Sequence, residues 1–151
     1  MAGSLAAQIV IVVPAKSPVD SLSTKTLQKI FKGQPVEKGD GRLFQIVEFS
    51  SVSDEFYKKL YNLDAYAIGK HWLRLIFSGE RVLPPKNFSA MNKFMKCLLS
   101  KGNTIGFLSA EEFKINKSDS VRAVVIDGHN FLDPNYTFKK NIKTKKKSNK
   151  H

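Results

Sequence analysis

A run of serines at a predicted strand-to-helix junction carries the clearest chemistry in this sequence: residues 47–54 read Val-Glu-Phe-Ser-Ser-Val-Ser-Asp. The first N–H groups of a helix have no partner inside the helix, and the positive end of the helix dipole lies beside them. An anion can bind there, and the hydroxyl groups of Ser50, Ser51 and Ser53 would add hydrogen-bond donors. Ordinary N-capping is the alternative. Asp54 favours it, because a carboxylate stabilises a helix start and repels a bound oxyanion.

Residue types that perform catalysis or bind metals do not form a motif elsewhere. His71, His129 and His151 lack metal-ligand spacing, and a single cysteine, Cys97, provides neither a disulfide nor a cysteine-rich zinc site. The sequence has no nucleophile elbow, no phosphate-binding loop ending in Gly-Lys-Ser/Thr and no dinucleotide-binding glycine pattern. We therefore predict that the protein is not an enzyme and has no catalytic residues, metal site or cofactor.

Positive charge is concentrated at the C-terminus. The chain has 151 residues with 25 Lys and Arg against 13 Asp and Glu, a formal net charge of +12. Residues 134–151 contain seven lysines and no acid, so residues 1–133 have 18 cations and 13 acids, a net charge of +5. We predict a folded domain over residues 5–133 and a basic, disordered tail over residues 134–151, whose polar composition buries too little surface to become ordered. In an alternative interpretation, a polyanion such as nucleic acid or an acidic polysaccharide binds this tail at Lys139, Lys140, Lys143, Lys145, Lys146 and Lys147.

Alternating strand and helix patterns predict an α/β fold with helices on both faces of a sheet. Residues 9–13 are five consecutive β-branched residues, which suits a strand buried on both faces, as in a parallel sheet. Further strands are predicted over residues 43–48, 104–108 and 121–126, and capped helices begin at Ser23, Ser50, Asp64 and Ser89. The helix over residues 64–77 is expected to face inward with Ile68, Trp72, Leu75 and Ile76. No apolar run approaches the roughly 20 residues that span a bilayer.

Four segments, in order along the chain, resemble the phosphate-type substrate-binding proteins of ABC transporters. They read LSTKTLQKIFKG (22–33), FYKKL (56–60), WLRLIFSG (72–79) followed by Pro-Pro-Lys, and GNTIGF (102–107). The resemblance covers residues 9–125, and it is closest to the short, single-lobe members of that superfamily.

The resemblance implies a single lobe of the periplasmic-binding-protein type, a three-layer α/β/α sandwich with a mostly parallel sheet. It also implies that a tetrahedral oxyanion, phosphate or another small one, binds at helix N-termini. On this basis Ser17, in the loop after the first strand, is expected to join Ser50, Ser51 and Ser53 as a ligand-binding residue.

This chain departs from the family at the binding motif. Phe49 stands where the family has glycine, and no arginine lies between Arg42 and Arg74 to form a bidentate clamp, so we expect weak binding. The resemblance further implies a periplasmic or otherwise extracytoplasmic protein. The first residues do not form a signal peptide, and we expect that one was removed before this sequence begins. A role in protein interaction, with an envelope protein or a second copy, remains open, and nucleic acid is not the expected partner.

Overall fold

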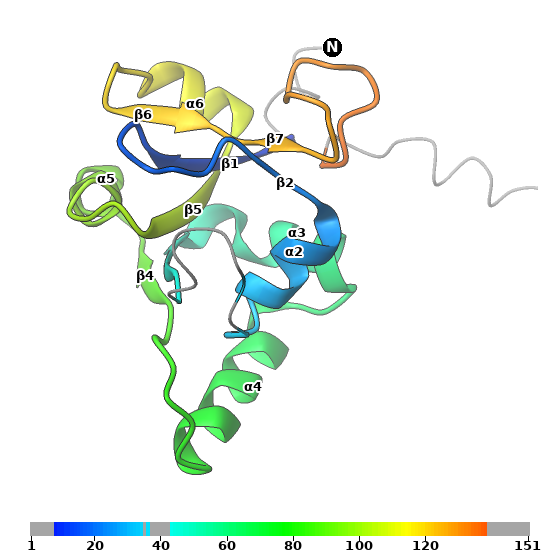
Figure 1. Ribbon diagram of the computed structural model, residues 1–151, viewed down its shortest axis with the longest axis vertical. Coiled ribbons are helices and arrows are strands. Elements are labelled where there is room, and N and C mark those ends of the chain that lie inside the picture. Colours follow the sequence, from blue (N-terminus) through cyan, green and yellow to red (C-terminus); the bar gives the residue numbers. More distant parts are fainter. Residues whose placement is uncertain (1–7, 35, 37–42, 139–151) are drawn as a thin grey trace, which may run out of the picture.

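The computed structural model describes residues 8–34, 36 and 43–138, and its centre is a five-stranded sheet (Figure 1). The strand order is β4-β3-β5-β1-β6, with β1 (Ile9–Pro14), β3 (Gln45–Phe49), β4 (Lys86–Phe88), β5 (Thr104–Ser109) and β6 (Val121–Ala123). A separate parallel pair joins β2 (Ser21–Leu22) to β7 (Val125–Ile126). The helices are α2 (Thr24–Ile30), α3 (Ser50–Tyr61), α4 (Ala65–Phe77), α5 (Met91–Leu98) and α6 (Ala110–Ile115).

Four of the five strands run in one direction. β3 pairs in parallel with β4 and β5, whereas β1 pairs antiparallel with both β5 and β6. The predicted fold class, a mostly parallel sheet in an α/β sandwich, is therefore confirmed. β1 is buried along its whole length, as its β-branched run predicted, but it is the one strand that runs the other way. Burial on two faces produces the same sequence pattern in either direction, so the pattern could not reveal this.

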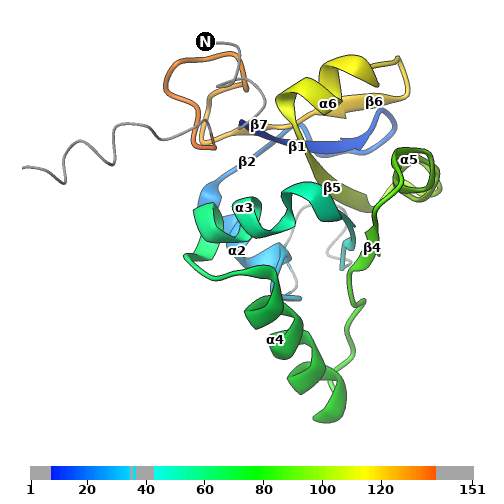
Figure 2. The ribbon, with the colours of Figure 1, turned by 180° about the vertical axis from the view of Figure 1, so that it is seen from behind.

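Helices cover both faces of the sheet. Neighbouring residues of β5 show this, because successive side chains of a strand point to opposite faces. Phe107 stacks on Phe56 of α3, with ring centroids 4.2 Å apart. A Cβ built on the adjacent Gly106 would instead lie 3.0 Å from the Phe94 ring of α5. Figures 1 and 2 show α2 with α3 on one side of the sheet and α6 on the other.

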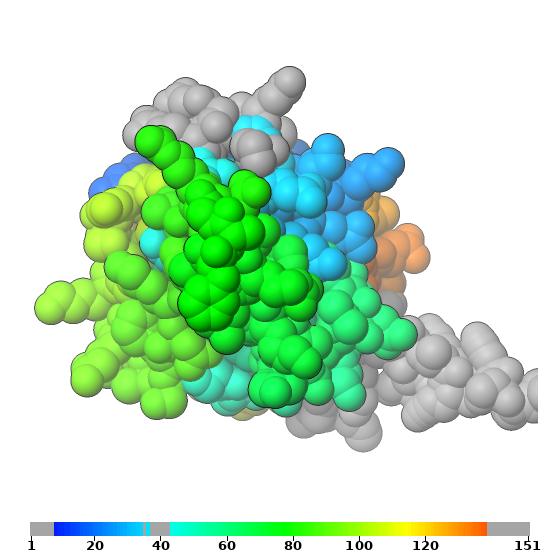
Figure 3. All heavy atoms as spheres, turned by 90° about the horizontal axis from the view of Figure 1, so that it is seen from below, coloured from blue at the N-terminus to red at the C-terminus, as the bar shows by residue number. Residues whose placement is uncertain are grey.

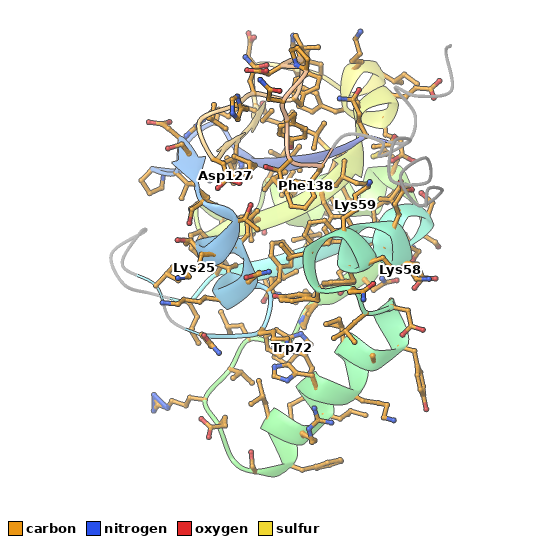
Figure 4. All side chains as sticks on the ribbon, turned by 90° about the vertical axis from the view of Figure 1, so that its right-hand side faces the viewer. Lys25, Lys58, Lys59, Trp72, Asp127 and Phe138 are labelled. Carbon is orange, nitrogen blue, oxygen red and sulfur yellow. The ribbon has the colours of Figure 1, made fainter. Side chains whose placement is uncertain are left out.

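The core extends further along the chain than the sequence predicted. Tyr136 and Phe138 are buried, and the Phe138 ring lies 5.7 Å from that of Phe56 (Figure 4). The N–H of Ile9 donates to the carbonyl of Phe138 at 3.1 Å, which fixes this segment beside β1. The domain boundary predicted at residue 133 is therefore too early. Tyr136 and Phe138 pack into the core, although the polar residues around them favour disorder. Residues 5–7 of the predicted domain and the tail from residue 139 lie outside the described residues.

The strand predicted over residues 121–126 is two strands in different sheets. β6 belongs to the main sheet and β7 to the pair with β2, and the N–H of Val124 between them donates to the carbonyl of Ile11. After β7, Asp127 adopts φ 52° in the left-handed region, which aspartate tolerates because its short polar side chain forms local hydrogen bonds. The chain thus turns back toward the start of α2.

Asp127 holds that turn to α2 (Figure 4). Its Oδ1 accepts from the Thr24 N–H at 2.8 Å, and its Oδ2 accepts from the hydroxyls of Thr24 at 2.5 Å and Thr137 at 3.0 Å. Burial acts to raise the pKa of Asp127, but the hydrogen bonds from Thr24 and Thr137 and the nearby His129 outweigh it and lower the pKa. The carboxylate therefore stabilises the fold in its charged form.

We expect Asp127→Asn to lower the free energy of unfolding by about 1 kcal/mol at neutral pH, as the loss of a helix cap does. Because the folded-state pKa lies below the ordinary value of 3.8, the carboxylate contributes fully above the unfolded-state pKa. That contribution is lost as the pH falls through the folded-state pKa. Asparagine also tolerates the left-handed backbone, so the change removes charge without new strain. Urea unfolding from neutral pH to below about pH 3 checks this, and parallel stability curves for the two proteins would contradict it.

α4 extends away from the sheet and touches the rest of the molecule along one side (Figures 1 and 2). Its predicted cap is confirmed, since Oδ1 of Asp64 accepts from the Ala67 N–H at 2.9 Å. Trp72 packs against Gly33, where an added Cβ would lie 2.8 Å from the indole ring. Ile76, however, was expected to face inward and is exposed. Helical periodicity locates apolar residues on a helix, but it does not show which of them a neighbouring element covers.

Candidate anion-binding site

The N-terminus of α3 is not capped by a side chain. Phe49 occupies the N-cap position with extended backbone, φ −108° and ψ 116°, and its side chain has no polar atom. None of the three serines in the first turn caps the helix, so the alternative of ordinary serine capping is wrong. The first N–H groups of α3 thus lack the side-chain acceptor that usually satisfies them. This is the property of a helix start that favours an incoming anion.

All three predicted serines donate hydrogen bonds inside the protein, and Ser51 donates to Glu112 as described below. The Ser50 hydroxyl donates to Oδ1 of Asn87 at 2.6 Å and approaches the Phe88 carbonyl at 3.1 Å, which ties α3 to β4. The buried hydroxyl of Ser53 donates to the Phe49 carbonyl at 3.1 Å. Neither proton is directed to a ligand in this arrangement. Ser51 is exposed.

Ser17 does not join the other serines. Gly106 of β5 pairs with both Val12 of β1 and Val47 of β3, so these three residues mark one level of the sheet. From that level β3 runs toward Ser50, whereas the antiparallel β1 runs toward Ser17 at the opposite edge. Ser17 is also engaged locally: its Oγ accepts from the Val19 N–H at 3.1 Å, and its carbonyl accepts from the Arg122 guanidinium. The expectation that Ser17 shares the site is wrong, because β1 runs antiparallel to β5.

The start of α3 lies at the carboxyl edge of the sheet, where β3 and β5 end. These neighbouring strands are parallel, yet β3 continues into α3 on one face and β5 into α6 on the other (Figures 1 and 2). Open α/β sheets bind ligands where adjacent strands diverge in this way. α5 also begins at this edge, after β4, and its N-cap is Ala90 without a side-chain hydrogen bond rather than the predicted Ser89.

Glu112 brings a carboxylate to the start of α3. Its Oε1 accepts from the Ser109 N–H at 3.0 Å and Ser109 Oγ accepts from the Glu112 N–H at 3.0 Å, a capping box that the sequence predicted. Its Oε2 accepts from the Ser51 hydroxyl at 3.3 Å. Asp54 was expected to place its negative charge at the start of α3. Its Oδ1 instead accepts from the Ala65 N–H at 2.9 Å, at the start of α4. Glu112 is therefore the carboxylate that would compete with a bound anion.

A hydrogen-bonded network connects α3 to β3 and β4. Glu48 of β3 accepts from the Tyr57 hydroxyl at 2.6 Å and from the Asn87 amide at 3.0 Å, and Asn87 in turn accepts from Ser50. Burial, followed by the charge of Glu48, raises the pKa of Tyr57 well above its ordinary value, so this hydroxyl stays protonated and donates. The sequence signalled none of these contacts, because the pairing of β3 with β4 brings residues 48 and 87 together and the packing of α3 adds residue 57.

The other residues considered for chemistry have structural surroundings. Nε2 of His71 lies 3.0 Å from the Lys32 carbonyl, and Nδ1 of His129 lies 2.9 Å from Oδ2 of Asp133. Cys97 is half-buried on α5. Among residues 8–34, 36 and 43–138, no three His, Cys, Asp or Glu side chains are grouped so that they could hold a metal ion. No helix in this part of the chain is long and apolar enough to cross a membrane.

Solved structures with a similar fold are substrate-binding proteins. A candidate phosphate ABC transporter substrate-binding protein with bound phosphate, from Clostridium perfringens, matches 95% of this chain and 51% of its own length, at a TM-score of 0.60 and 19% identity. An ABC-type phosphate transport receptor from Vibrio cholerae matches 82% of this chain and 48% of its own (TM-score 0.53, 18% identity). A candidate phosphate-binding protein from Planctomyces limnophilus matches 80% of this chain and 41% of its own length, at a TM-score of 0.56 and 14% identity.

These matches define the fold class. The chain has the mixed α/β fold of one lobe of such proteins, and it spans about half of the length of the structures from Clostridium perfringens and Vibrio cholerae. No protein-family model and no curated protein matches the sequence. The likeness therefore concerns architecture, and the ligand has to be argued from the residues of this chain.

Proposed function

We propose that this chain is a non-enzymatic, extracytoplasmic binding protein that holds a small inorganic oxyanion, phosphate or sulfate, at the N-terminus of α3. The observation that carries the proposal is the uncapped first turn of α3, which opens at the carboxyl edge of β3 where β3 and β5 diverge. Backbone N–H groups and the helix dipole would supply the binding, with Ser51 as the side-chain donor. The phosphate bound in the similar structure from Clostridium perfringens supports this choice of ligand.

The affinity should be low. The hydroxyls of Ser50 and Ser53 donate to other groups of the protein. The hydroxyl of Ser51 donates to the Glu112 carboxylate, whose negative charge would compete with a bound anion. No arginine lies between Arg42 and Arg74 in the sequence to neutralise the anion. We therefore expect dissociation constants on the order of millimolar, which correspond to about 4 kcal/mol of binding free energy.

Removing the competing charge should strengthen binding. We expect Glu112→Gln to lower the dissociation constant for phosphate about tenfold, because glutamine preserves the capping box and deletes the negative charge. Thermal unfolding measured across a phosphate titration reports the change, since a ligand at ten times its dissociation constant stabilises the folded state by about 1.4 kcal/mol. Ser51→Ala should weaken the effect of phosphate on the melting temperature.

Glu111→Gln is the matched control, because Glu111 is exposed and adjacent on α6 but makes no contact with Ser51 among the described hydrogen bonds. It should leave phosphate binding unchanged. If neither phosphate nor sulfate shifts the melting temperature or produces heat on calorimetric titration of the wild-type protein and of Glu112→Gln, the oxyanion proposal is wrong.

The alternative partner, a polyanion bound by the C-terminal lysines, concerns residues 139–151, which lie outside the described residues. The comparisons with solved structures do not favour it. A protein-interaction role with an envelope partner or a second copy likewise stays a prediction.

A further inference from the structure

Exposed apolar side chains gather on one part of this molecule. Eight large hydrophobic residues are exposed within residues 8–34, 36 and 43–138, and six of them belong to α4 or to the segments that adjoin it. These six, which we call the α4 surface, are Leu63, Tyr66, Leu73, Ile76, Phe77 and Leu83. Figure 3 looks onto this end of the molecule and shows the α4 residues, in green, standing in front of the rest. Monomeric proteins rarely expose such a concentration unless it binds something.

α4 is apolar on two sides. Ile68 and Trp72 face the body of the protein and are buried. Tyr66, Leu73 and Phe77, spaced seven and four residues apart, lie together on another side, with exposed fractions of 75%, 52% and 82%. A helix that is apolar around most of its circumference is normally covered around most of it. Within the described part of the chain, nothing covers the outer side.

The charges around the α4 surface favour an anionic partner over a second copy of the chain. From Ala65 to Lys86 the chain carries four cations, Lys70, Arg74, Arg81 and Lys86, and one carboxylate, Glu80. Lys70 and Arg74 are exposed on α4, and Nζ of Lys70 lies 5.3 Å from the centroid of the Tyr66 ring. A second copy of the chain would bring the same cations against these, which is unfavourable. An anionic partner would be attracted to them.

We propose that the α4 surface binds the surface of an anionic lipid membrane. Aromatic and aliphatic side chains on one side of a helix, bordered by lysine and arginine, are the features of helices that lie in the plane of a membrane interface. α4 protrudes from the body, so a flat surface can reach its outer side (Figures 1 and 2). The rings of Tyr66 and Phe77 would enter the interface, and Lys70 and Arg74 would extend to the phosphate groups of the lipids.

Sedimentation of the full chain with lipid vesicles tests this. Vesicles of phosphatidylcholine containing phosphatidylglycerol should bind the protein, and vesicles of phosphatidylcholine alone should bind it much less. We expect Phe77→Ser to weaken binding about tenfold, as the loss of one buried apolar side chain does. Lys70→Gln combined with Arg74→Gln should weaken it about thirtyfold. Both variants should keep the wild-type response to phosphate, because they leave the start of α3 intact.

Matched controls distinguish binding at the α4 surface from nonspecific hydrophobic or electrostatic binding. Ile115→Ser removes an apolar side chain that is 74% exposed on α6, and Lys93→Gln with Lys96→Gln removes two exposed charges from α5. Neither control should reduce vesicle binding as strongly as the α4 variants.

If Phe77→Ser fails to fold, Leu73→Ser replaces it. The proposal is overturned if the wild-type protein does not bind anionic vesicles, if the controls lose as much binding, or if deleting residues 139–151 abolishes binding that the α4 variants leave unchanged. A concentration-dependent dimer that Phe77→Ser dissociates would assign the α4 surface to a second copy instead.

Discussion

Replacing Phe56 with alanine is expected to lower the free energy of unfolding by about 3–5 kcal/mol, the range for deleting a buried aromatic side chain. Phe56 is fully buried, and its ring lies within 6 Å of the rings of Phe31, Tyr57, Phe107 and Phe138. These neighbours belong to separate segments whose backbones are held by hydrogen bonds, so they can fill only part of the space that the ring leaves. A loss of this size is a large part of the stability of a typical domain.

Denaturant unfolding followed by circular dichroism measures the effect. Phe77→Ala is the matched control, because it removes the same atoms from a side chain that is 82% exposed, and it should change stability by less than about 0.5 kcal/mol. Similar losses for the two variants would mean that the aromatic cluster around Phe56 does not form the core.

We expect Gly106→Ala to have the second large effect, lowering the free energy of unfolding by about 3 kcal/mol, near the upper end of the range for overpacking a core. A Cβ at this position would lie 2.7 Å from the carbonyl oxygen of Val47 and 3.0 Å from Cζ of Phe94. The carbonyl belongs to the backbone of β3, so it cannot move without disturbing the pairing of β3 with β5. Because β3 leads directly into α3, the variant should also reduce any response to phosphate.

Gly69→Ala is a control that should raise the free energy of unfolding instead of lowering it. Gly69 lies inside α4, and an added Cβ would meet nothing within 4 Å, so alanine should raise stability by about 0.5–1 kcal/mol through its better helix propensity. Urea unfolding of both glycine variants at one pH measures the pair. An unchanged midpoint for Gly106→Ala would show that β3 and β5 can separate slightly at little cost, and steric exclusion of a Cβ would then not account for glycine at position 106.

Local signals predicted much of the secondary structure. Ser23 and Asp64 each cap the helix they were expected to cap, and Ser109 with Glu112 forms the expected capping box. These interactions join residues three positions apart, so a short stretch of sequence contains both partners. The helix start at Ser50 was also correct, although no serine caps it.

The candidate site was predicted only in part, because it depends on which strands are neighbours. The position of α3 followed from the serine-rich junction, but the approach of Glu112 to Ser51 requires β5 to lie beside β3. Ser17 was placed in the wrong part of the molecule for the same reason, since its position depends on the direction of β1.

The sequence by itself determined the alternation of strands and helices, the buried character of β1 and the resemblance to substrate-binding proteins, because these follow from short-range periodicity and local motifs. Only the tertiary structure decided the antiparallel course of β1, the burial of Phe138 and the exposure of Phe77. Whether an apolar side chain is covered depends on elements distant in the sequence. A pattern within one helix therefore cannot distinguish the side of α4 that packs on the protein from the side that is left open.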